Sequence, residues 1–199
     1  MDLGAVRDHE PNTVSDEPRE AAVVVPVLER DRTPHLLFTK RADHLQDHPG
    51  QMSFPGGGRE PEDDSLSDTA LREASEEIGL ERTEVDWVGR IDDIRTVTRY
   101  SVRPYVARIP DRTYHRCDEE VAEIAILPIP DLTDPANYES ERRDHPYYGD
   151  TRLHYFYVDG YTVWGATARM LVQLLELATD WEMPPAVDRV VDADAEFPT

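Results

Sequence analysis

The distribution of hydrophobic and polar residues along the chain predicts a set of short strands. The apolar, β-branched run at 21–29 and the run at 35–41 predict two strands joined by a turn. Pro26 in the first run favours an edge strand or a bulge, because proline donates no hydrogen bond to a ladder. Further strands are predicted at 85–97, 101–109 and 121–129, and 153–164 predicts a hairpin around Asp159-Gly160.

Two other segments have apolar residues at helical spacing. Residues 65–78 predict a helix whose start Asp64 or Ser65 can cap and whose end Gly79 can close in a left-handed conformation. Its apolar face consists of Leu66, Ala70, Ala74 and Ile78. Residues 166–178 predict a second amphipathic helix. Strands mixed with two separated helices predict a single α/β or α+β domain in which helices cover a sheet.

The remaining segments are polar and are predicted to lie outside this core. Residues 1–20 contain two prolines and show no periodicity, so they predict a flexible N-terminal segment before a domain at 21–180. Residues 131–151 predict loops, and 181–199 predict a C-terminal tail. The chain has no apolar run near 18 residues, and its first residues lack the apolar stretch of a secretory signal. We therefore expect no membrane span and no secretion.

The charge balance narrows the classes of partner. The chain has 42 acidic and 21 basic residues, a formal net charge of −21, and a single lysine, Lys40. Such a surface repels nucleic acids and anionic membranes, so we expect neither as a partner. The carboxylates are scattered along the chain, which favours adaptation to a high-salt cytoplasm over acidic tails on an ordinary domain. The single cysteine, Cys117, excludes an internal disulfide and fits a reducing cytoplasm.

The segment REASEEIGL at 72–80 contains the most informative residues. Glu73, Glu76 and Glu77 share one face of the predicted helix, where like charges repel one another and the helix dipole disfavours them. A bound Mg²⁺ or Mn²⁺ explains this arrangement, because hard cations require grouped oxygen ligands. Arg72 is placed to orient or partly neutralise the three carboxylates. The alternative is a solvated acidic face in an acidic protein.

A glycine-rich loop, FPGGGREPEDD at 54–64, leads into the same helix. Gly56, Gly57 and Gly58 allow a tight backbone path and a close approach of main-chain groups to a ligand or metal. A glycine run alone is equally typical of a flexible turn. Its position at a fixed distance before the arginine–glutamate helix favours a functional role.

Gly58, Asp64, Arg72-Glu73, Glu76-Glu77 and Gly79-Leu80 together resemble the Nudix box. The family pattern has glutamate where Asp64 stands, and pairing the box glycine with Gly57 instead puts Asp63 there. The resemblance implies a Nudix α/β/α sandwich with a mixed sheet. It also implies that Glu73, Glu76 and Glu77 bind the metal ions, helped by a main-chain carbonyl of the glycine loop, which we assign to Gly57.

The flanking residues are similar to the coenzyme A pyrophosphatase branch of this family, which has an LLT-x-R strand, a spaced His-x-Gly and FPGG before the box. Lys40-Arg41, His48, Gly50 and 54–57 fill those places. This similarity implies substrate contacts from Lys40, Arg41, His48 and the glycines 56–58. Neighbouring strand residues point to opposite faces, so only one of Lys40 and Arg41 can face the site, and the family pattern favours Arg41.

The expected reaction is metal-dependent hydrolysis of coenzyme A to 3′,5′-ADP and 4′-phosphopantetheine. The general base is left open between a box glutamate and a downstream carboxylate: Glu119, Glu120 or Glu123. Arg95, Arg99 and Arg103 are either contacts for a 3′-phosphate or ordinary surface arginines. ADP-ribose or an oxidised nucleotide is the alternative substrate, and a non-catalytic ligand sensor is the alternative class. The assembly state stays open, with a homodimer among the alternatives.

Overall fold

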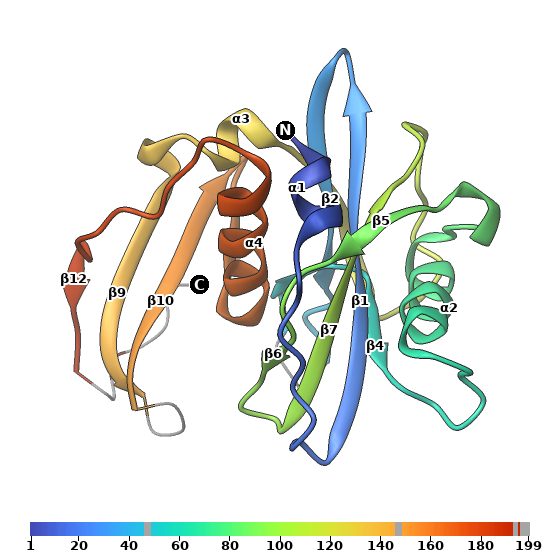
Figure 1. Ribbon diagram of the computed structural model, residues 1–199, viewed down its shortest axis with the longest axis horizontal. Coiled ribbons are helices and arrows are strands. Elements are labelled where there is room, and N and C mark those ends of the chain that lie inside the picture. Colours follow the sequence, from blue (N-terminus) through green and yellow to red (C-terminus); the bar gives the residue numbers. More distant parts are fainter. Residues whose placement is uncertain (46–48, 146–148, 193–194, 196–199) are drawn as a thin grey trace.

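The computed structural model describes residues 1–45, 49–145, 149–192 and 195, and these form two sheets with helices around them (Figure 1). The helices are α1 (Leu3–Asp8), α2 (Leu66–Ile78), α3 (Ile129–Leu132) and α4 (Gly165–Ala178), with short 3-10 turns at η1 (Arg82–Glu84) and η2 (Pro135–Asn137). The strands are β1 (Arg19–Arg30), β2 (Thr33–Arg41), β3 (Met52–Ser53), β4 (Gly56–Gly58), β5 (Asp86–Arg90), β6 (Ile94–Arg95), β7 (Tyr100–Arg108), β8 (Val121–Pro128), β9 (Tyr138–His145), β10 (Gly149–Val158), β11 (Tyr161–Trp164) and β12 (Arg189–Val190).

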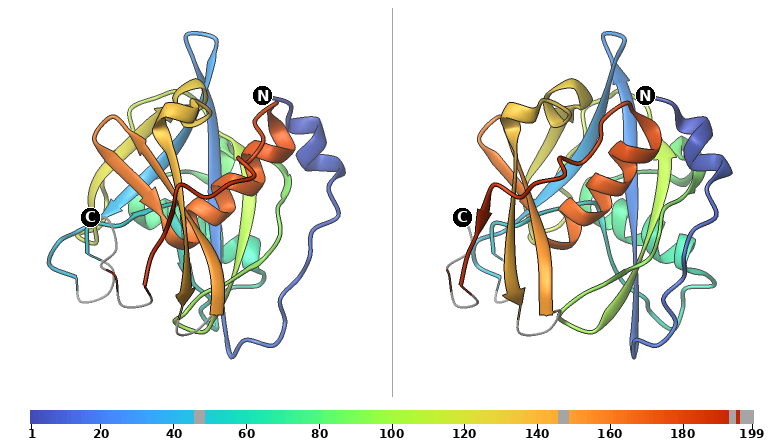
Figure 2. Two further views of the ribbon diagram at one scale, coloured as in Figure 1. Left: turned by 90° about the vertical axis from the view of Figure 1, so that its left-hand side faces the viewer. Right: turned by 60° about the vertical axis from the view of Figure 1, so that its left-hand side comes forward.

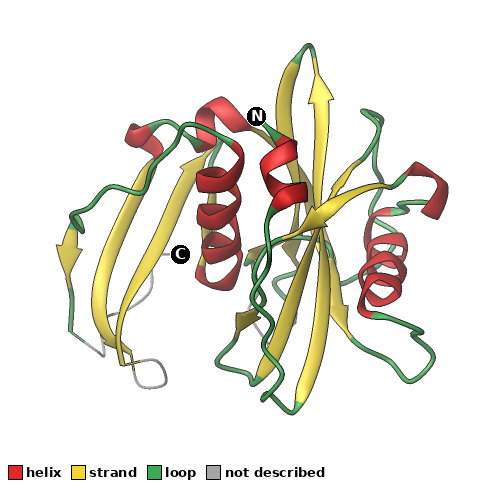
Figure 3. Ribbon diagram, viewed as in Figure 1, coloured by secondary structure: helices red, strands yellow, loops and turns green. Residues whose placement is uncertain are grey.

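The larger sheet is mixed and lies between two helical layers. Its order is β3-β2-β1-β7-β5, with β4 on β1, β6 on β7 and β8 on β2; β1 runs antiparallel to β2 and parallel to β7. Alternate residues of β1 face opposite cores, so Val24 packs with the α2 residue Ala70 while Val25 packs with the α4 residue Leu171. Figure 3 shows the same three layers, with α2 on one side and α1 and α4 on the other. The predicted α/β/α architecture is confirmed.

A second sheet lies against the outer side of α4, and only its β10-β11 hairpin was predicted (Figure 2). Strands β9, β10 and β11 are antiparallel neighbours, and β12 from the C-terminal region pairs in parallel with β9. The prediction of loops at 131–151 is therefore wrong for β9. This strand escaped detection because its buried residues include Glu141 and Arg143, which are 2% exposed and form an ion pair with each other. The alternation of hydrophobic and polar residues does not identify a strand whose buried side chains are charged.

The prediction of a flexible N-terminal segment is wrong for residues 3–8. The side chains of Leu3 and Val6 are buried, and Asp2 caps α1 by accepting a hydrogen bond from the backbone N–H of Gly4. The backbone N–H of Asp2 also donates to the carbonyl of Ala178 at the end of α4, over 2.6 Å. Six residues are too few to show helical periodicity in a sequence. The domain bounds at 21–180 stay a prediction.

Two further differences concern β1 and β5. Pro26 lies in a central strand, at the point where the β1 ladder with β4 at 21–23 has ended and the ladder with β2 has not yet begun. Because Pro26 has no partner in β4 or β2, its missing N–H removes no hydrogen bond from either ladder. The predicted strand at 85–97 is divided into β5 and β6.

The Asp159-Gly160 turn is confirmed, with φ angles of 52° and 80°. Among the described residues, no helix has the length and hydrophobicity needed to cross a bilayer.

Candidate metal and substrate site

Helix α2 forms as the sequence predicts and fixes the three glutamates on a rigid element. The hydroxyl of Ser65 accepts a hydrogen bond from the backbone N–H of Asp68 and caps the first turn. Gly79 ends the helix in the left-handed conformation, with φ of 66°. The apolar face of α2 packs on the sheet, and Ala70 and Ala74 are fully buried. The glutamates are thereby held beside this buried face.

The glycine loop passes under α2 as strand β4 and pairs with residues 21–23 of β1. A Cβ atom added to Gly57 would lie 2.5 Å from the Oε1 atom of Glu73, so the main chain touches this carboxylate directly. At Gly56 the φ angle is 153°, and an added Cβ would lie 2.3 Å from the carbonyl oxygen of Ala22. Glycine is thus required at Gly56, whereas a side chain at Gly57 would displace the Glu73 carboxylate.

Glu77 is the most perturbed carboxyl group of this cluster. Burial raises its pKa to about 8, and the nearby charges of Glu73 and Glu120 act in the same direction. The backbone N–H of Gly56 and the charge of Arg41 oppose this rise. One carboxylate oxygen, Oε2, is buried and has no hydrogen-bond partner among the described residues. A buried acceptor without a donor is costly unless a ligand completes it.

Arg72 links the start of the loop to two of the glutamates. Its Nη1 atom lies 3.1 Å from Glu73 and 3.2 Å from Glu76. Its Nη2 atom donates to the carbonyl of Gly58 over 3.0 Å, and its Nε atom donates to Asp63 over 3.0 Å. Burial raises the pKa of Glu73 despite this contact with Arg72. The predicted role of Arg72 as a neutralising and orienting residue fits these contacts.

The two aspartates considered for the box position differ in their surroundings. Asp63 is buried and accepts hydrogen bonds from Arg72, from the hydroxyl of Thr69 and from the backbone N–H of Glu60. The Arg72 guanidinium holds the pKa of Asp63 well below its usual range. Asp64 is exposed. Because both oxygens of Asp63 are occupied, we assign it the positioning of Arg72 and not the binding of a metal.

The residues present fit a divalent cation, although the ligands are not yet gathered around one point. No three His, Cys, Asp or Glu side chains converge as a metal site within the described part of the chain. The observations in favour are the unpartnered Oε2 of Glu77, the raised pKa of Glu73 and the direct contact of Gly57 with Glu73. A cation would satisfy the buried oxygen, while Glu73 and the exposed Glu76 would exchange Arg72 for the metal.

The predicted substrate-binding residues are only partly brought together. The charge of Arg41 acts on Glu77, and its guanidinium lies 3.6 Å from Glu120. Lys40 belongs to the opposite face of β2, where its Nζ atom lies 2.9 Å from Glu123. Arg41 is therefore the member of this pair that faces the glutamates. His48 lies outside the described residues.

The arginines considered for a 3′-phosphate do not approach this cluster as free donors. Arg103 forms two hydrogen bonds to the buried Asp93, over 3.0 and 2.8 Å. Arg95 contacts Asp16 and Glu17, and Arg99 is exposed. The sequence did not indicate that the side chain of Gln51 lies beside Gly165, the first residue of α4. No sequence signal marks this contact, because it depends on how the loop before β3 folds.

Comparisons with known proteins agree with this geometry. Residues 18–158 match the family model described as the NUDIX domain. The chain is 39% identical over 160 residues to a protein named uncharacterized Nudix hydrolase NudL from Enterobacter sp. (strain 638), covering 78% of this chain and 81% of that protein. It is 34% identical over 175 residues to the protein of the same name from Yersinia enterocolitica, covering 84% and 85%.

Similar solved structures are more distant. The NUDIX domain of Shewanella oneidensis NrtR, complexed with ADP ribose, has a TM-score of 0.49 and 17% identity, covering 66% of this chain and 86% of that one. A C. elegans Ap4A hydrolase in a binary complex has a TM-score of 0.48 and 15% identity, covering 57% and 82%. The family assignment therefore rests on the sequence matches.

Proposed function

This chain belongs to the Nudix hydrolase family, and we propose that it hydrolyses the pyrophosphate bond of coenzyme A in a reaction that depends on Mg²⁺ or Mn²⁺. The products are 3′,5′-ADP and 4′-phosphopantetheine. The observation that carries the catalytic part is the unpartnered, buried Oε2 of Glu77 beside Glu73 and the glycine backbone. The choice of coenzyme A is supported by the residues before the box, above all Arg41 and FPGG at 54–57.

Glu73, Glu76 and Glu77 are the residues that would hold the cation, with the main chain at Gly57. A bound divalent cation supplies charge neutralisation to the phosphates and lowers the pKa of a coordinated water. The chain itself supplies the orientation. Arg72, fixed by Asp63, holds Glu73 and Glu76 on the site side of α2. The glycines of β4 leave space for the Glu73 carboxylate beside the main chain, because a side chain at Gly57 would occupy the position of that carboxylate.

Among the downstream carboxylates, Glu120 is the best candidate for the general base. Its charge contributes to the raised pKa of Glu77, and its side chain is 55% exposed, so it is close to the cluster and accessible to water. Arg41 lies beside it and can take a substrate phosphate. Glu123 is instead occupied by Lys40 and by the hydroxyl of Tyr161, 2.9 Å away. Glu119 is exposed.

We expect Glu76→Gln and Glu77→Gln each to lower kcat for coenzyme A by more than about 100-fold, since even residues that only support metal ligands are worth 10- to 100-fold. The assay is product identification after incubation of coenzyme A with the protein and Mg²⁺ or Mn²⁺. Titration calorimetry with Mn²⁺ measures metal binding independently. Glu62→Gln, which removes the same charge from an exposed loop position, serves as the matched control.

The substrate is tested with a panel that includes ADP-ribose and an oxidised nucleoside triphosphate. A tenfold preference for ADP-ribose over coenzyme A would overturn the choice of substrate but leave the reaction class intact. Full activity in both glutamine variants would overturn the metal site. Tight binding of a nucleotide without any turnover would show a ligand sensor instead.

A further inference from the structure

Two hydrogen bonds fasten the segment 109–120, which joins β7 to β8, to the C-terminal end of α2. The Nη2 atom of Arg112 donates to the carbonyl of Gly79 over 2.8 Å. The backbone N–H of Cys117 donates to the carbonyl of Glu77 over 3.0 Å. The first part of this segment is therefore tied to the helix end that carries one of the proposed metal ligands.

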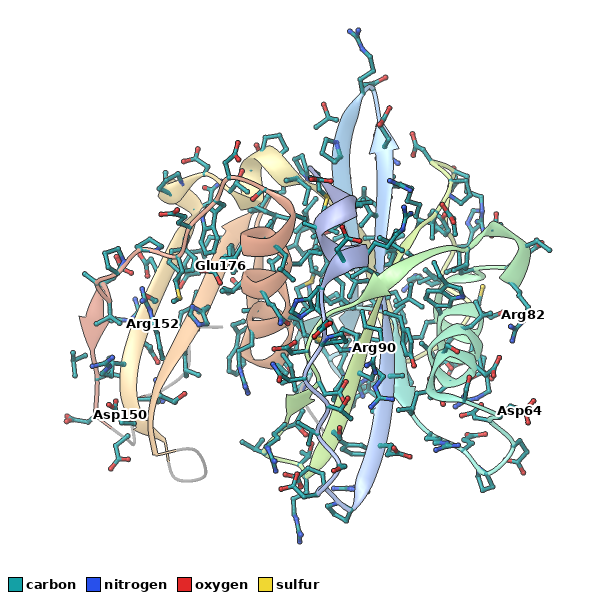
Figure 4. The ribbon with its side chains drawn as sticks, in the orientation of Figure 1. Asp64, Arg82, Arg90, Asp150, Arg152 and Glu176 are labelled. Carbon is teal, nitrogen blue, oxygen red and sulfur yellow. The ribbon has the colours of Figure 1, made fainter. Side chains whose placement is uncertain are left out.

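Arg112 and Tyr114 hold this first part in one conformation. Arg112 forms two hydrogen bonds of 2.6 Å with Glu84, which lies in η1, the turn in which Figure 4 labels Arg82. The Arg112 guanidinium also lies 4.1 Å above the ring of Tyr114. Tyr114 is 8% exposed, packs in the core under α2 and donates from its hydroxyl to the carbonyl of Pro110 over 2.7 Å. Burial and paired charges thus fix the base of the segment.

The end of the segment is held by the residue that follows β2. The backbone N–H of Ala42 donates to the carbonyl of Glu120 over 2.8 Å, and the Nη1 atom of Arg116 donates to the carbonyl of Ala122 over 2.7 Å. Glu120 also lies 3.6 Å from the guanidinium of Arg41. The segment therefore has one attachment at α2 and another beside β2, and Glu120 lies at the second attachment.

Asp118 fixes the backbone between these two attachments. Its Oδ1 atom accepts a hydrogen bond from the backbone N–H of Glu120 over 2.7 Å. Aspartate closes turns in this way, by accepting the N–H of the residue two positions on. Because Ala42 donates to the carbonyl of Glu120, both backbone polar groups of Glu120 have a partner. A fixed backbone conformation limits the rotamers that the Glu120 side chain can adopt.

We propose that Asp118 is a positioning residue, which holds the Glu120 carboxylate beside Glu77 and Arg41 so that it takes a proton from the attacking water. The water oxygen forms a bond to phosphorus while the bond from phosphorus to the bridging oxygen breaks, and the electron pair leaves with the bridging oxygen. This inference rests on the proposed function and adds to it a residue outside the glutamate cluster. A general base must lie within hydrogen-bond reach of the proton, so a displacement of about 1 Å can lower the rate about 100-fold.

The competing explanation is that Asp118 acts through its negative charge. Asp118→Asn and Asp118→Ala both remove this charge, but only asparagine keeps an oxygen that can accept the N–H of Glu120. A positioning role therefore predicts a loss in the alanine variant alone. Asp134→Ala is the matched control, because Asp134 is also exposed and accepts the backbone N–H of Ala136, two residues on, over 2.9 Å at the start of η2.

The first measurement is steady-state kinetics with coenzyme A. We expect Asp118→Ala to lower kcat about 10-fold with KM unchanged, because the base is displaced while substrate binding is not altered. Asp118→Asn and Asp134→Ala should retain the wild-type kcat. Glu120→Gln should lower kcat at least about 100-fold, the usual contribution of a general base. Adding Asp118→Ala to this variant should have no further effect, because Asp118 acts through Glu120.

The second measurement follows the segment without any turnover. In the metal-free protein, hydrogen exchange at the backbone N–H of Glu120 should be faster in Asp118→Ala than in the wild type, and Asp118→Asn should keep the wild-type rate. Titration calorimetry with Mn²⁺ should give the same affinity for all three proteins, since the glutamates of α2 are unchanged. A changed affinity for Mn²⁺ would show that Asp118 acts on the metal site and would overturn the positioning of Glu120.

The outcomes separate this inference from the proposed function. No hydrolysis of coenzyme A by the wild-type protein would overturn the proposed substrate, and the variants are then compared on the nucleotide of the panel that is hydrolysed. Full activity of Glu120→Gln would overturn both the general base and its positioning, but not the reaction class. If Glu120→Gln is impaired, the positioning role alone is overturned by wild-type kcat in Asp118→Ala, by equal losses in the alanine and asparagine variants, or by an additive loss in the double variant.

Discussion

At the scale of single residues, His154 makes the stability of the fold sensitive to mild acid. Its pKa falls from an ordinary value of 6.5 to about 4 on folding, so the folded protein holds the neutral imidazole and the unfolded chain binds the proton first. The stability that this residue contributes is fully present above pH 6.5 and is lost as the pH falls toward 4. The loss amounts to about 3 kcal/mol at most, from the shift in pKa.

We therefore expect the free energy of unfolding, measured by urea denaturation, to decrease between pH 6.5 and 4.5 more steeply in the wild type than in His154→Gln. Carboxylates with lowered pKa values, such as Asp63 and Asp92, also destabilise the fold in acid, but they act in both proteins. Parallel curves for the two proteins would contradict the assignment of a neutral, buried His154.

At the scale of elements, the short helix α1 is expected to contribute to stability out of proportion to its length. Val6 is fully buried, Leu3 is 7% exposed, and both belong to the core between the larger sheet and α4. We expect the double variant Leu3→Ala/Val6→Ala to lose about 3 kcal/mol of unfolding free energy, measured by urea denaturation. Arg7→Ala, on the exposed face of the same helix, is the control and should change stability by less than about 0.5 kcal/mol. Equal losses of unfolding free energy in the double variant and in Arg7→Ala would show that α1 does not pack on this core.

Elements with strong local signals could be predicted from the sequence, and elements defined by long-range contacts could not. Helix α2 has an N-cap, a periodic apolar face and a terminal glycine within one segment, so its bounds follow from local residues. The hairpin at Asp159-Gly160 has a comparable local signal. By contrast, β9 buries Glu141 and Arg143, and Glu141 forms ion pairs both with Arg143 and with Arg189 from a strand near the end of the chain. Nothing near β9 in the sequence indicates that its charges have partners.

The same distinction applies to the candidate site. The glutamates on one helical face and the glycines before them could be placed from spacing alone, because both lie within 25 residues of one another. The sequence could not show whether Asp63 or Asp64 takes the acidic position of the box, since this depends on which of the two carboxylates lies beside Arg72 in the folded loop.

At the scale of the whole molecule, the net charge of −21 opposes the compact state. Acidic residues outnumber basic ones two to one, so half of the carboxylates have no cation to pair with even if every arginine and the lysine form an ion pair. Salt weakens both the repulsion among these carboxylates and the existing surface pairs. The repulsion is the larger effect, because exposed pairs contribute little and the unpaired charges are in the majority.

We therefore expect the melting temperature to rise as KCl increases from low concentration to about 1 M, where the Debye length falls to about 3 Å. Calorimetry or fluorescence melting measures this slope. Its cause is tested with a variant that replaces five exposed carboxylates by their amides: Glu10, Glu62, Asp64, Glu119 and Asp180. If repulsion sets the slope, the variant melts higher at low salt and gains less from KCl. If salt acts on hydrophobic burial instead, both proteins gain equally, and a falling melting temperature would mean that ion pairs outweigh the repulsion.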